Sequence, residues 1–225
     1  MLANIVFQFF TQGGPIMWPI LISALVAVAV VGERTFWWIR ESRKRDPQKL
    51  EQILAALENA DTAAARQIAA GSEDPVIRTI RLGLDHLGHT HKSMLGALQL
   101  AAGMELKRAG RFLTVMDTLV TLAPLLGLLG TVTGLMGAFL NIGSAELSVA
   151  GVTGGIGQAL IATACGLGIA IFSLIPFNYF SAKVAQLQFD LETAATNVEV
   201  MAGGGKDGDT VHLAQPATPG QATSH

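Results

Sequence analysis

Charged side chains are scarce in this sequence. They make up 14% of its 225 residues, while half of the residues are hydrophobic. Soluble domains carry about 25% charged residues, so the composition is that of a membrane protein and predicts the lipid bilayer as a partner. The formal net charge is −2, and no basic stripe interleaves with aromatic residues, so we expect no nucleic-acid partner.

Cysteine is almost absent, since Cys165 is the single one. This excludes an internal disulfide and any zinc cluster built on cysteines. The apolar segments contain no H-E-x-x-H, no G-x-S-x-G and no nucleophile–base pair, which argues against an enzyme. The histidines of "DHLGHTH" (85–91) are expected to be solvated rather than to hold a metal. We therefore expect no catalytic residue, no metal and no cofactor.

Basic residues are missing from the N-terminus, because no Lys or Arg precedes Glu33. The chain therefore lacks the basic start of a cleaved signal peptide. A membrane-spanning helix needs about 20 apolar residues, and three segments provide them. We expect an all-α membrane protein with transmembrane helices at 15–39, 113–142 and 152–181. Glu33 and Arg34 are adjacent near the inner end of the first span. Pairing with neighbouring copies of the chain is one interpretation, and snorkelling to the interface is the simpler expectation.

Lysine and arginine cluster on one side of these spans. They lie at both ends of the segment 40–112, whereas the stub 1–14 and the loop 143–151 contain none. The positive-inside rule therefore places 40–112 in the cytoplasm and the N-terminus outside, in the periplasm. A further helix at 182–202 and a Gly- and Pro-rich, disordered tail at 203–225 follow on the cytoplasmic side.

The segment 40–112 is expected to be helical. Two Asp-Pro pairs, at 46–47 and 74–75, have the pattern of an N-cap followed by proline at the first helical position. "DTAAARQIAAG" (61–71) starts on another aspartate and stops at a glycine that is typical of a helix end. From Lys92 we expect one amphipathic helix that runs unbroken into the second span.

Small residues recur along the second span with a period of 3.5, which predicts one face for close helix packing: Ala123, Gly127, Gly130, Gly134 and Gly137. A second face, polar in its cytoplasmic half, carries Thr114, Asp117, Thr121, Pro124, Leu128 and Thr131. The third span repeats the small-residue design with Ala159, Thr163, Gly166, Ala170 and Ser173. Close packing alone, with hydroxyls bonded to their own helix, is the simpler explanation of these patterns.

Gln158 stands out in the third span as one bulky amide among glycines and alanines. It lies about 100° around the helix from Ala159. An unsatisfied buried amide costs roughly 2–7 kcal/mol, so its side chain must meet a partner on a neighbouring helix or in a hydrated pore.

The motifs of the second and third spans resemble a known family. "LAPLLGLLGTVTGLMGAF" (122–139) and "GGIGQALIATACGLGIAI" (154–171) are similar to the MotA/TolQ/ExbB family, closest to ExbB, and "GGPIMWPILISALVAVAVVGERTFW" (13–37) resembles its first span. The resemblance implies a subunit of the bacterial inner membrane that forms a homopentameric ring. It implies an ExbD/TolR-like partner with a single span and an intramembrane Asp, and a TonB-like protein as a further partner. Such a motor couples the proton motive force to energised transport or mechanical work at the outer membrane.

Residue by residue, the resemblance implies an ion pathway. Thr131 and Thr163 match the family's pore-lining threonines, and Pro124 matches the proline of its "AP" motif. Asp117 stands in the "DT" that precedes this motif, and we interpret it as lining the cytoplasmic mouth, with Thr121 on the same polar face. The helix-packing residues are Gly127, Gly130, Gly134, Gly137 and Gly166.

Gln158 departs from the family pattern, because ExbB and TolQ proteins usually have glutamate at this position. Glutamine keeps the size and the hydrogen bonding of glutamate, but it does not bind and release a proton. Three hypotheses follow. The partner's Asp carries the ion, and Gln158 is a hydrogen-bonding group along the path. The ion is sodium, which amide and hydroxyl oxygens can ligate. Or the ring is a membrane scaffold that conducts nothing.

Overall fold

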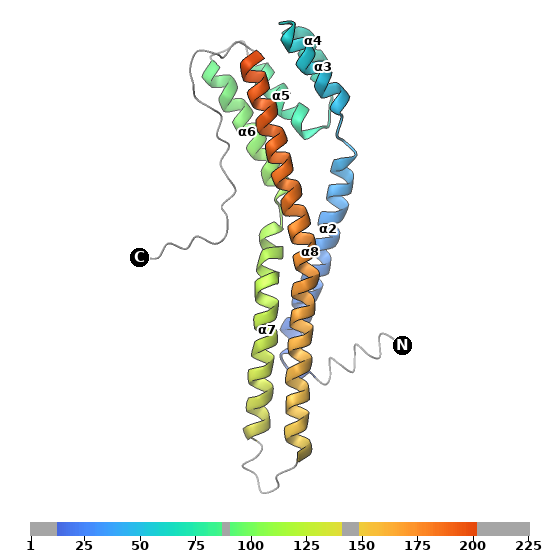
Figure 1. Ribbon diagram of the computed structural model, residues 1–225, viewed down its shortest axis with the longest axis vertical. Coiled ribbons are helices and arrows are strands. Elements are labelled where there is room, and N and C mark those ends of the chain that lie inside the picture. The colour runs from blue at the N-terminus through green and yellow to red at the C-terminus, as the bar shows by residue number, and fades with distance from the viewer. Residues whose placement is uncertain (1–12, 87–90, 141–148, 202–225) are drawn as a thin grey trace, which may run out of the picture. The chain divides into compact units, whose positions relative to one another are not determined.

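The computed structural model describes residues 13–86, 91–140 and 149–201. Every regular element in these residues is an α-helix, in the order shown in Figure 1. The helices are α2 (Met17–Ser42), α3 (Pro47–Glu58), α4 (Thr62–Ala69), α5 (Pro75–Asp85), α6 (His91–Ala109), α7 (Leu113–Leu140) and α8 (Val149–Met201). The predicted tail 203–225 and most of the predicted stub 1–14 and loop 143–151 lie outside the described residues.

Three helical stretches in the described residues are long and apolar enough to cross a membrane. They lie within Met17–Ser42, Lys92–Leu140 and Thr153–Met201, so the expectation of an all-helical protein with three candidate spans is confirmed.

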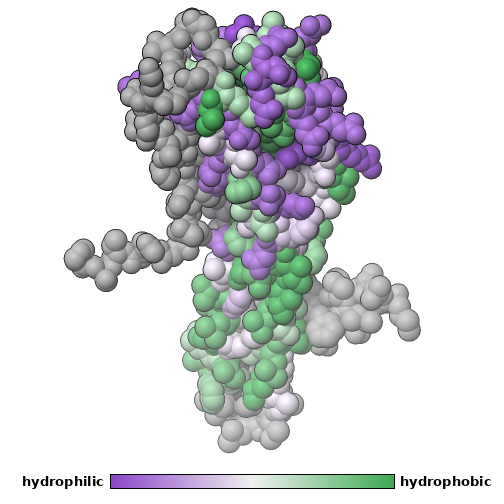
Figure 2. Space-filling view, turned by 45° about the horizontal axis from the view of Figure 1, so that its top comes forward, coloured by the Kyte–Doolittle hydropathy of each residue, from purple (hydrophilic) through white to green (hydrophobic). Residues whose placement is uncertain are grey.

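The chain divides into two compact units. The first unit comprises Met1–Trp37 and Phe112–Ser181, and the second comprises Trp38–Arg111 and Ala182–His225. Figure 2 shows apolar side chains over much of the visible surface of the first unit, and mostly polar ones over the second. An apolar exterior is what a bilayer requires of the first unit.

In the first unit, α7 and the N-terminal half of α8 lie side by side (Figure 1). A Cβ added to Gly166 would lie 2.5 Å from the carbonyl oxygen of Ala123, and one added to Gly134 would lie 3.0 Å from that of Gly155. The two helices therefore touch at backbone distance, which small residues make possible in lipid. The buried residues of α7 form one stripe along this contact: Met116, Leu119, Ala123, Gly127, Gly130, Gly134 and Ala138.

Gly137 departs from the stripe that the sequence predicts. It is exposed, and nothing lies within 4 Å of a Cβ added to it, whereas Ala138 is buried at this end of the stripe. The predicted stripe assumed a period of 3.5 residues, but a straight helix has about 3.6 residues per turn. The next residue after Gly134 that faces α8 is therefore Ala138, four positions later, and not Gly137, three positions later.

The N-terminal turns of α2 pack on α8 in the same unit. Met17 and Ile20 of α2 form a buried apolar cluster with Ala162 of α8, and Leu126 of α7 packs against it. This cluster identifies the sides of α7 and α8 that face α2, which matters for the candidate site.

In the second unit, the three short helices begin at aspartate caps, as expected. Each aspartate accepts a hydrogen bond from a backbone N–H in the first turn, Asp46 from Lys49 (3.1 Å), Asp61 from Ala64 (2.9 Å) and Asp74 from Val76 (2.8 Å). Helix α4 is followed by Gly71 with φ of 73°, the left-handed conformation of a C-terminal cap. Helix α5 supplies the core of the unit, because four of its side chains have no exposed surface: Val76, Ile77, Ile80 and Leu84.

Ion pairs connect the helices of the second unit. Nη2 of Arg78 on α5 lies 2.8 Å from Oε2 of Glu105 on α6 and 3.3 Å from Oε1 of Glu41 on α2. Burial lowers the pKa of Arg78, but hydrogen bonding and charge attraction from Glu105, and then from Glu41, outweigh it and raise the pKa above its ordinary value. Arg45 pairs with Asp190 of α8 at 2.6 Å. The part of α2 in this unit is thus held to α5, and the part of α8 is held to the connection between α2 and α3.

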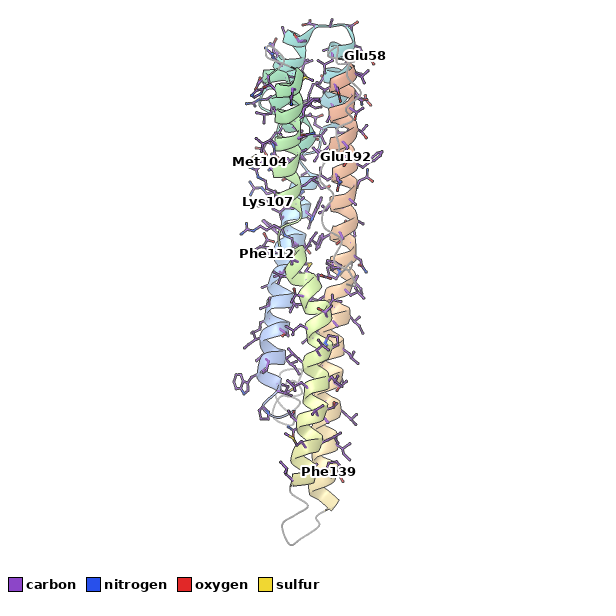
Figure 3. All side chains as sticks on the ribbon, turned by 90° about the vertical axis from the view of Figure 1, so that its left-hand side faces the viewer. Glu58, Met104, Lys107, Phe112, Phe139 and Glu192 are labelled. Atoms are coloured by element: carbon purple, nitrogen blue, oxygen red, sulfur yellow. The ribbon has the colours of Figure 1, made fainter. Side chains whose placement is uncertain are left out.

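The helix expected to run unbroken from Lys92 is divided into α6 and α7. A turn at residues 110–112 separates them, and Figure 3 labels Phe112 at this junction. Phe112 has φ of 64°, a left-handed conformation that a bulky residue keeps only when its surroundings hold it. The guanidinium of Arg34 lies over its ring at 5.7 Å from the ring centroid and at 4.9 Å from that of Trp37. A tertiary contact therefore stabilises the interruption.

Arg34 does not snorkel as expected. Only 1% of the residue is exposed. Its Nε and Nη2 donate to the two carboxylate oxygens of Glu33 at 2.6 and 2.9 Å. A paired guanidinium between aromatic rings is stabilised without reaching water, so the arginine packs inside the first unit.

Candidate functional site

Thr163 joins the two helices that carry the family-like motifs. Its Oγ1 donates to the carbonyl oxygen of Gly127 on α7 at 3.1 Å, and it also lies 3.3 Å from that of Ala159 on its own helix. The bond across the helices requires a close approach, because a Cβ on Gly127 would lie 3.0 Å from Cα of Thr163. A hydroxyl and a glycine thus form one polar contact inside the apolar helix pair.

Gln158 packs on the segment that leads into α2. Gly14 has φ of 72°, and a Cβ there would collide with Nε2 of Gln158, so the amide occupies the space that a side chain at position 14 would fill. A cavity of about 510 Å³ lies beside it. The cavity is lined by Pro15 and Ile16 before α2, by Gly155 and Gln158 of α8, and by four residues of α7: Thr133, Gly134, Gly137 and Ala138.

Gln158 and Thr163 lie on different sides of α8. A separation of five positions turns the helix by about 140°. Gln158 lines the cavity next to the segment before α2, whereas Thr163 contacts α7 through Gly127. The single chain therefore does not bring these two predicted site residues together.

Thr131, like Thr163, lies on a side of its helix that is turned away from α2. Leu126 packs on the α2 side of α7, and Thr131 follows it by five residues, again about 140° around the helix. Thr131 is half-buried, and its Oγ1 donates to the carbonyl oxygen of Leu128 at 2.7 Å. Thr131 and Thr163 thus lie on the sides of α7 and α8 that are turned away from α2.

Asp117 and Thr121 lie in the first turns of α7, more than two helical turns from Thr131. Asp117 is half-buried and Thr121 is exposed. The hydroxyl of Thr121 lies 3.0 Å from the carbonyl oxygen of Thr118 and 3.3 Å from that of Asp117. It therefore bonds back to its own helix, as threonines in apolar helices commonly do. The Asp117 carboxylate is the acidic group on the polar face of this helix.

Sequence reasoning missed two residues that the structure places beside Gln158. The turn at Gly14 could have been predicted from the sequence, because "GGP" (13–15) is typical of a turn with a left-handed glycine just before a helix. Thr133 was not recoverable in this way, because it lies outside both faces drawn from the 3.5-residue period. Its Oγ1 lies 3.0 Å from the carbonyl oxygen of Leu129 and 3.2 Å from that of Gly130.

Comparison with known proteins places this arrangement in a family. The sequence model of the MotA/TolQ/ExbB proton channel family matches residues 59–193. The chain is 36% identical over 197 residues to the biopolymer transport protein ExbB-like 1 of Synechocystis sp., which covers 80% of this chain and 76% of that protein. It is 35% identical over 171 residues to ExbB-like 3 of the same organism, covering 75% of this chain and 81% of the relative.

A shorter match reaches a protein named ExbB itself. The chain is 39% identical over 89 residues to the biopolymer transport protein ExbB of Neisseria gonorrhoeae, covering 39% of this chain and 40% of that protein. The family match and the ExbB relatives support a transport subunit coupled to the proton motive force, and the three apolar helical stretches support a multi-pass membrane location. This chain belongs to the MotA/TolQ/ExbB proton channel family.

Proposed function

We propose that the chain is the ring-forming subunit of an ion-driven motor in a bacterial inner membrane. Its N-terminus lies in the periplasm and its C-terminus in the cytoplasm, as the placement of lysine and arginine favours. The ring is a homopentamer around the single transmembrane helices of an ExbD/TolR-like partner whose intramembrane Asp binds the ion. A TonB-like protein carries the work to the outer membrane, and the relatives' name, biopolymer transport protein, supports energised transport as the load.

One observation carries this proposal: Thr131 and Thr163 lie on the sides of α7 and α8 turned away from α2. Hydroxyl groups that face lipid have no partner beyond their own helix, so polar positions in a span are expected to face protein or a hydrated path. A ring of copies with α2 outside turns these sides inward. There the threonines can hydrogen-bond to the partner's helix or to water beside its Asp.

A second candidate function, the scaffold ring that conducts nothing, is favoured by the position of Gln158. Its amide does not titrate, and it packs against the turn at Gly14 instead of sharing a side of α8 with Thr163. In this case Gln158 holds the start of α2 against α8, and the ring organises other proteins without moving ions.

Ion flux into liposomes that contain the full chain and its co-expressed partner distinguishes the two. We expect proton flux in the native complex and its loss with Thr163→Val, while the mass of the complex is unchanged. Thr133→Val is the matched control, because Thr133 lies on the α2 side of α7 and its hydroxyl bonds to its own helix; it should conduct as the native chain does.

Each alternative has its own outcome. Equal flux in the native complex and in Thr163→Val would refute the proposal that the Thr163 side of α8 lines the ion pathway. Flux that appears only with Gln158→Glu would support the scaffold and show that the glutamine prevents conduction. Flux under a sodium gradient but not under a proton gradient would identify sodium as the driving ion.

A further inference from the structure

In the second unit, α6 and α8 expose apolar side chains to solvent. The same parts of these helices also contain charged residues, as segments outside a membrane do. On α6, Leu100 is 64% and Met104 is 49% exposed; on α8, Phe189 is 64% and Val200 is 70% exposed. Single apolar residues at a surface are ordinary, but these recur at helical spacing on one face of each helix. Faces of this kind mark contacts with another protein.

The exposed face of α6 contains a hole, in the sense of knobs-into-holes packing, that can receive a side chain from another helix. Leu100, Gly103, Met104 and Lys107 follow the spacing i, i+3, i+4, i+7, and four residues in this arrangement surround the knob of a partner helix in coiled-coil packing. Gly103 forms the floor of this hole, because nothing lies within 4 Å of a Cβ added to it. Figure 3 labels Met104 and Lys107 along α6.

The exposed face of α8 supplies a knob and an opposite charge. Phe189 is a large ring without a cover on its outer side. Glu192, labelled in Figure 3, follows one turn later on the same helix. Its Oε1 accepts a hydrogen bond from Gln188 at 2.9 Å, and a carboxylate can accept further bonds. The hole on α6 is bordered by the cationic Lys107, so the two faces are complementary in shape and in charge.

We propose that these two faces meet between neighbouring copies of this chain: Phe189 of one copy inserts into the α6 hole of the next, and Glu192 pairs with Lys107. Contact between two α6 faces would bring lysine against lysine, and contact between two α8 faces would bring glutamate against glutamate. The interface is therefore head to tail, the kind that closes rings. The inference rests on the proposed ring and assigns it a contact outside the membrane-spanning segments.

Disulfide trapping in native membranes tests the interface, using the full chain in a Cys165→Ala background. Lys107→Cys combined with Glu192→Cys should give a ladder of cross-linked species under mild oxidation. Either single variant alone should give none, and a mixture of the two single variants should give only dimers. A cross-link requires Cα atoms within about 7 Å. The matched control combines Gln99→Cys with Gln186→Cys, exposed positions on the same helices, and should remain uncross-linked.

A second test exchanges the charges of Lys107 and Glu192 and measures ring association, while Phe189 and the apolar residues of the hole stay unchanged. Lys107→Glu should weaken ring association in mild detergent by up to about fivefold, as for an exposed ion pair, and adding Glu192→Lys should restore it. Phe189→Ala should weaken association more strongly than either charge change.

Three results would overturn the contact, and they differ in what they leave standing. Cross-linking of Lys107→Cys with itself as efficient as that of the double variant would overturn the head-to-tail arrangement. No cross-link in a complex whose mass shows several copies would refute this interface while leaving the proposed ring intact. A monomeric mass for the native chain would instead refute the ring, and with it the contact.

Discussion

The contact between α7 and α8 predicts that two glycines of the same helix respond in opposite ways to one methyl group. Gly166→Ala places a Cβ 2.5 Å from the carbonyl oxygen of Ala123 and 3.0 Å from Cα of Gly127. Both atoms are backbone, so α7 and α8 must separate by about 1 Å. Overpacking of this kind costs typically about 1–3 kcal/mol. At Gly168 nothing lies within 4 Å of an added Cβ.

The comparison of the two variants isolates the packing effect. Alanine gains about 1 kcal/mol over glycine in a helix interior, and this gain is common to both positions. Gly166→Ala should therefore have a free energy of unfolding about 1–3 kcal/mol below that of Gly168→Ala, which itself should match or exceed the native value. Unfolding by dodecyl sulfate in mixed micelles, followed by helical circular dichroism, measures the difference. Equal stabilities of the two variants would refute a backbone-distance contact.

Three further predictions concern polar contacts. Thr163→Val should destabilise the protein by about 1 kcal/mol because it removes the hydrogen bond to Gly127, and Thr163→Ser should restore it; the same micelle titration checks this. Asp74→Ala and Asp61→Ala should each lose roughly 1 kcal/mol of stability with the N-cap hydrogen bond. Asp74→Ala should lower the thermal stability of the second unit more, since Asp74 is 2% exposed whereas Asp61 is exposed. Arg78→Gln should cost about 2 kcal/mol, less than a fully buried pair because Arg78 is 30% exposed. Its raised pKa keeps Arg78 charged at neutral pH, so this contribution should be lost with rising pH only in the strongly alkaline range, as a pH series of thermal melts would show.

Features encoded by neighbouring residues could be predicted from the sequence. The aspartate caps at Asp46, Asp61 and Asp74 depend on a side chain and a backbone N–H two or three residues away, so the local pattern contains both partners. The three apolar spans follow from composition alone. The alternation of small residues in the second span predicted one face for close helix packing; Gly127, Gly130 and Gly134 of this face lie against α8, whereas Gly137 does not.

Features that depend on contacts between distant segments could not be predicted. Nothing near Phe112 in the sequence signals a left-handed residue, because Arg34, 78 positions earlier, supplies the ring contact that accompanies it. The burial of Arg34 was missed for the same reason, since one of its aromatic neighbours, Phe112, comes from the distant turn before α7. The partner of Gln158 belongs to this class too: the amide meets Gly14, and only the packing of α2 on α8 brings these residues together.

The separation of Gln158 from Thr163 constrains how any channel in this family member can work. A pore formed by the sides of α7 and α8 turned away from α2 contains the hydroxyls of Thr131 and Thr163, and Gln158 lies about 140° around α8 from Thr163. Such hydroxyls can pass hydrogen bonds along a path, but they do not titrate near neutral pH. Position 158 holds an amide, which does not titrate either, so in the proposed motor the carboxylate that binds and releases the proton at this depth comes from another chain. Gln158→Glu tests whether α8 keeps this orientation in a working channel. If α8 does not rotate, the new carboxylate stays beside Gly14 and leaves proton flux unchanged, whereas rotation would expose it to the path and change the pH dependence of flux.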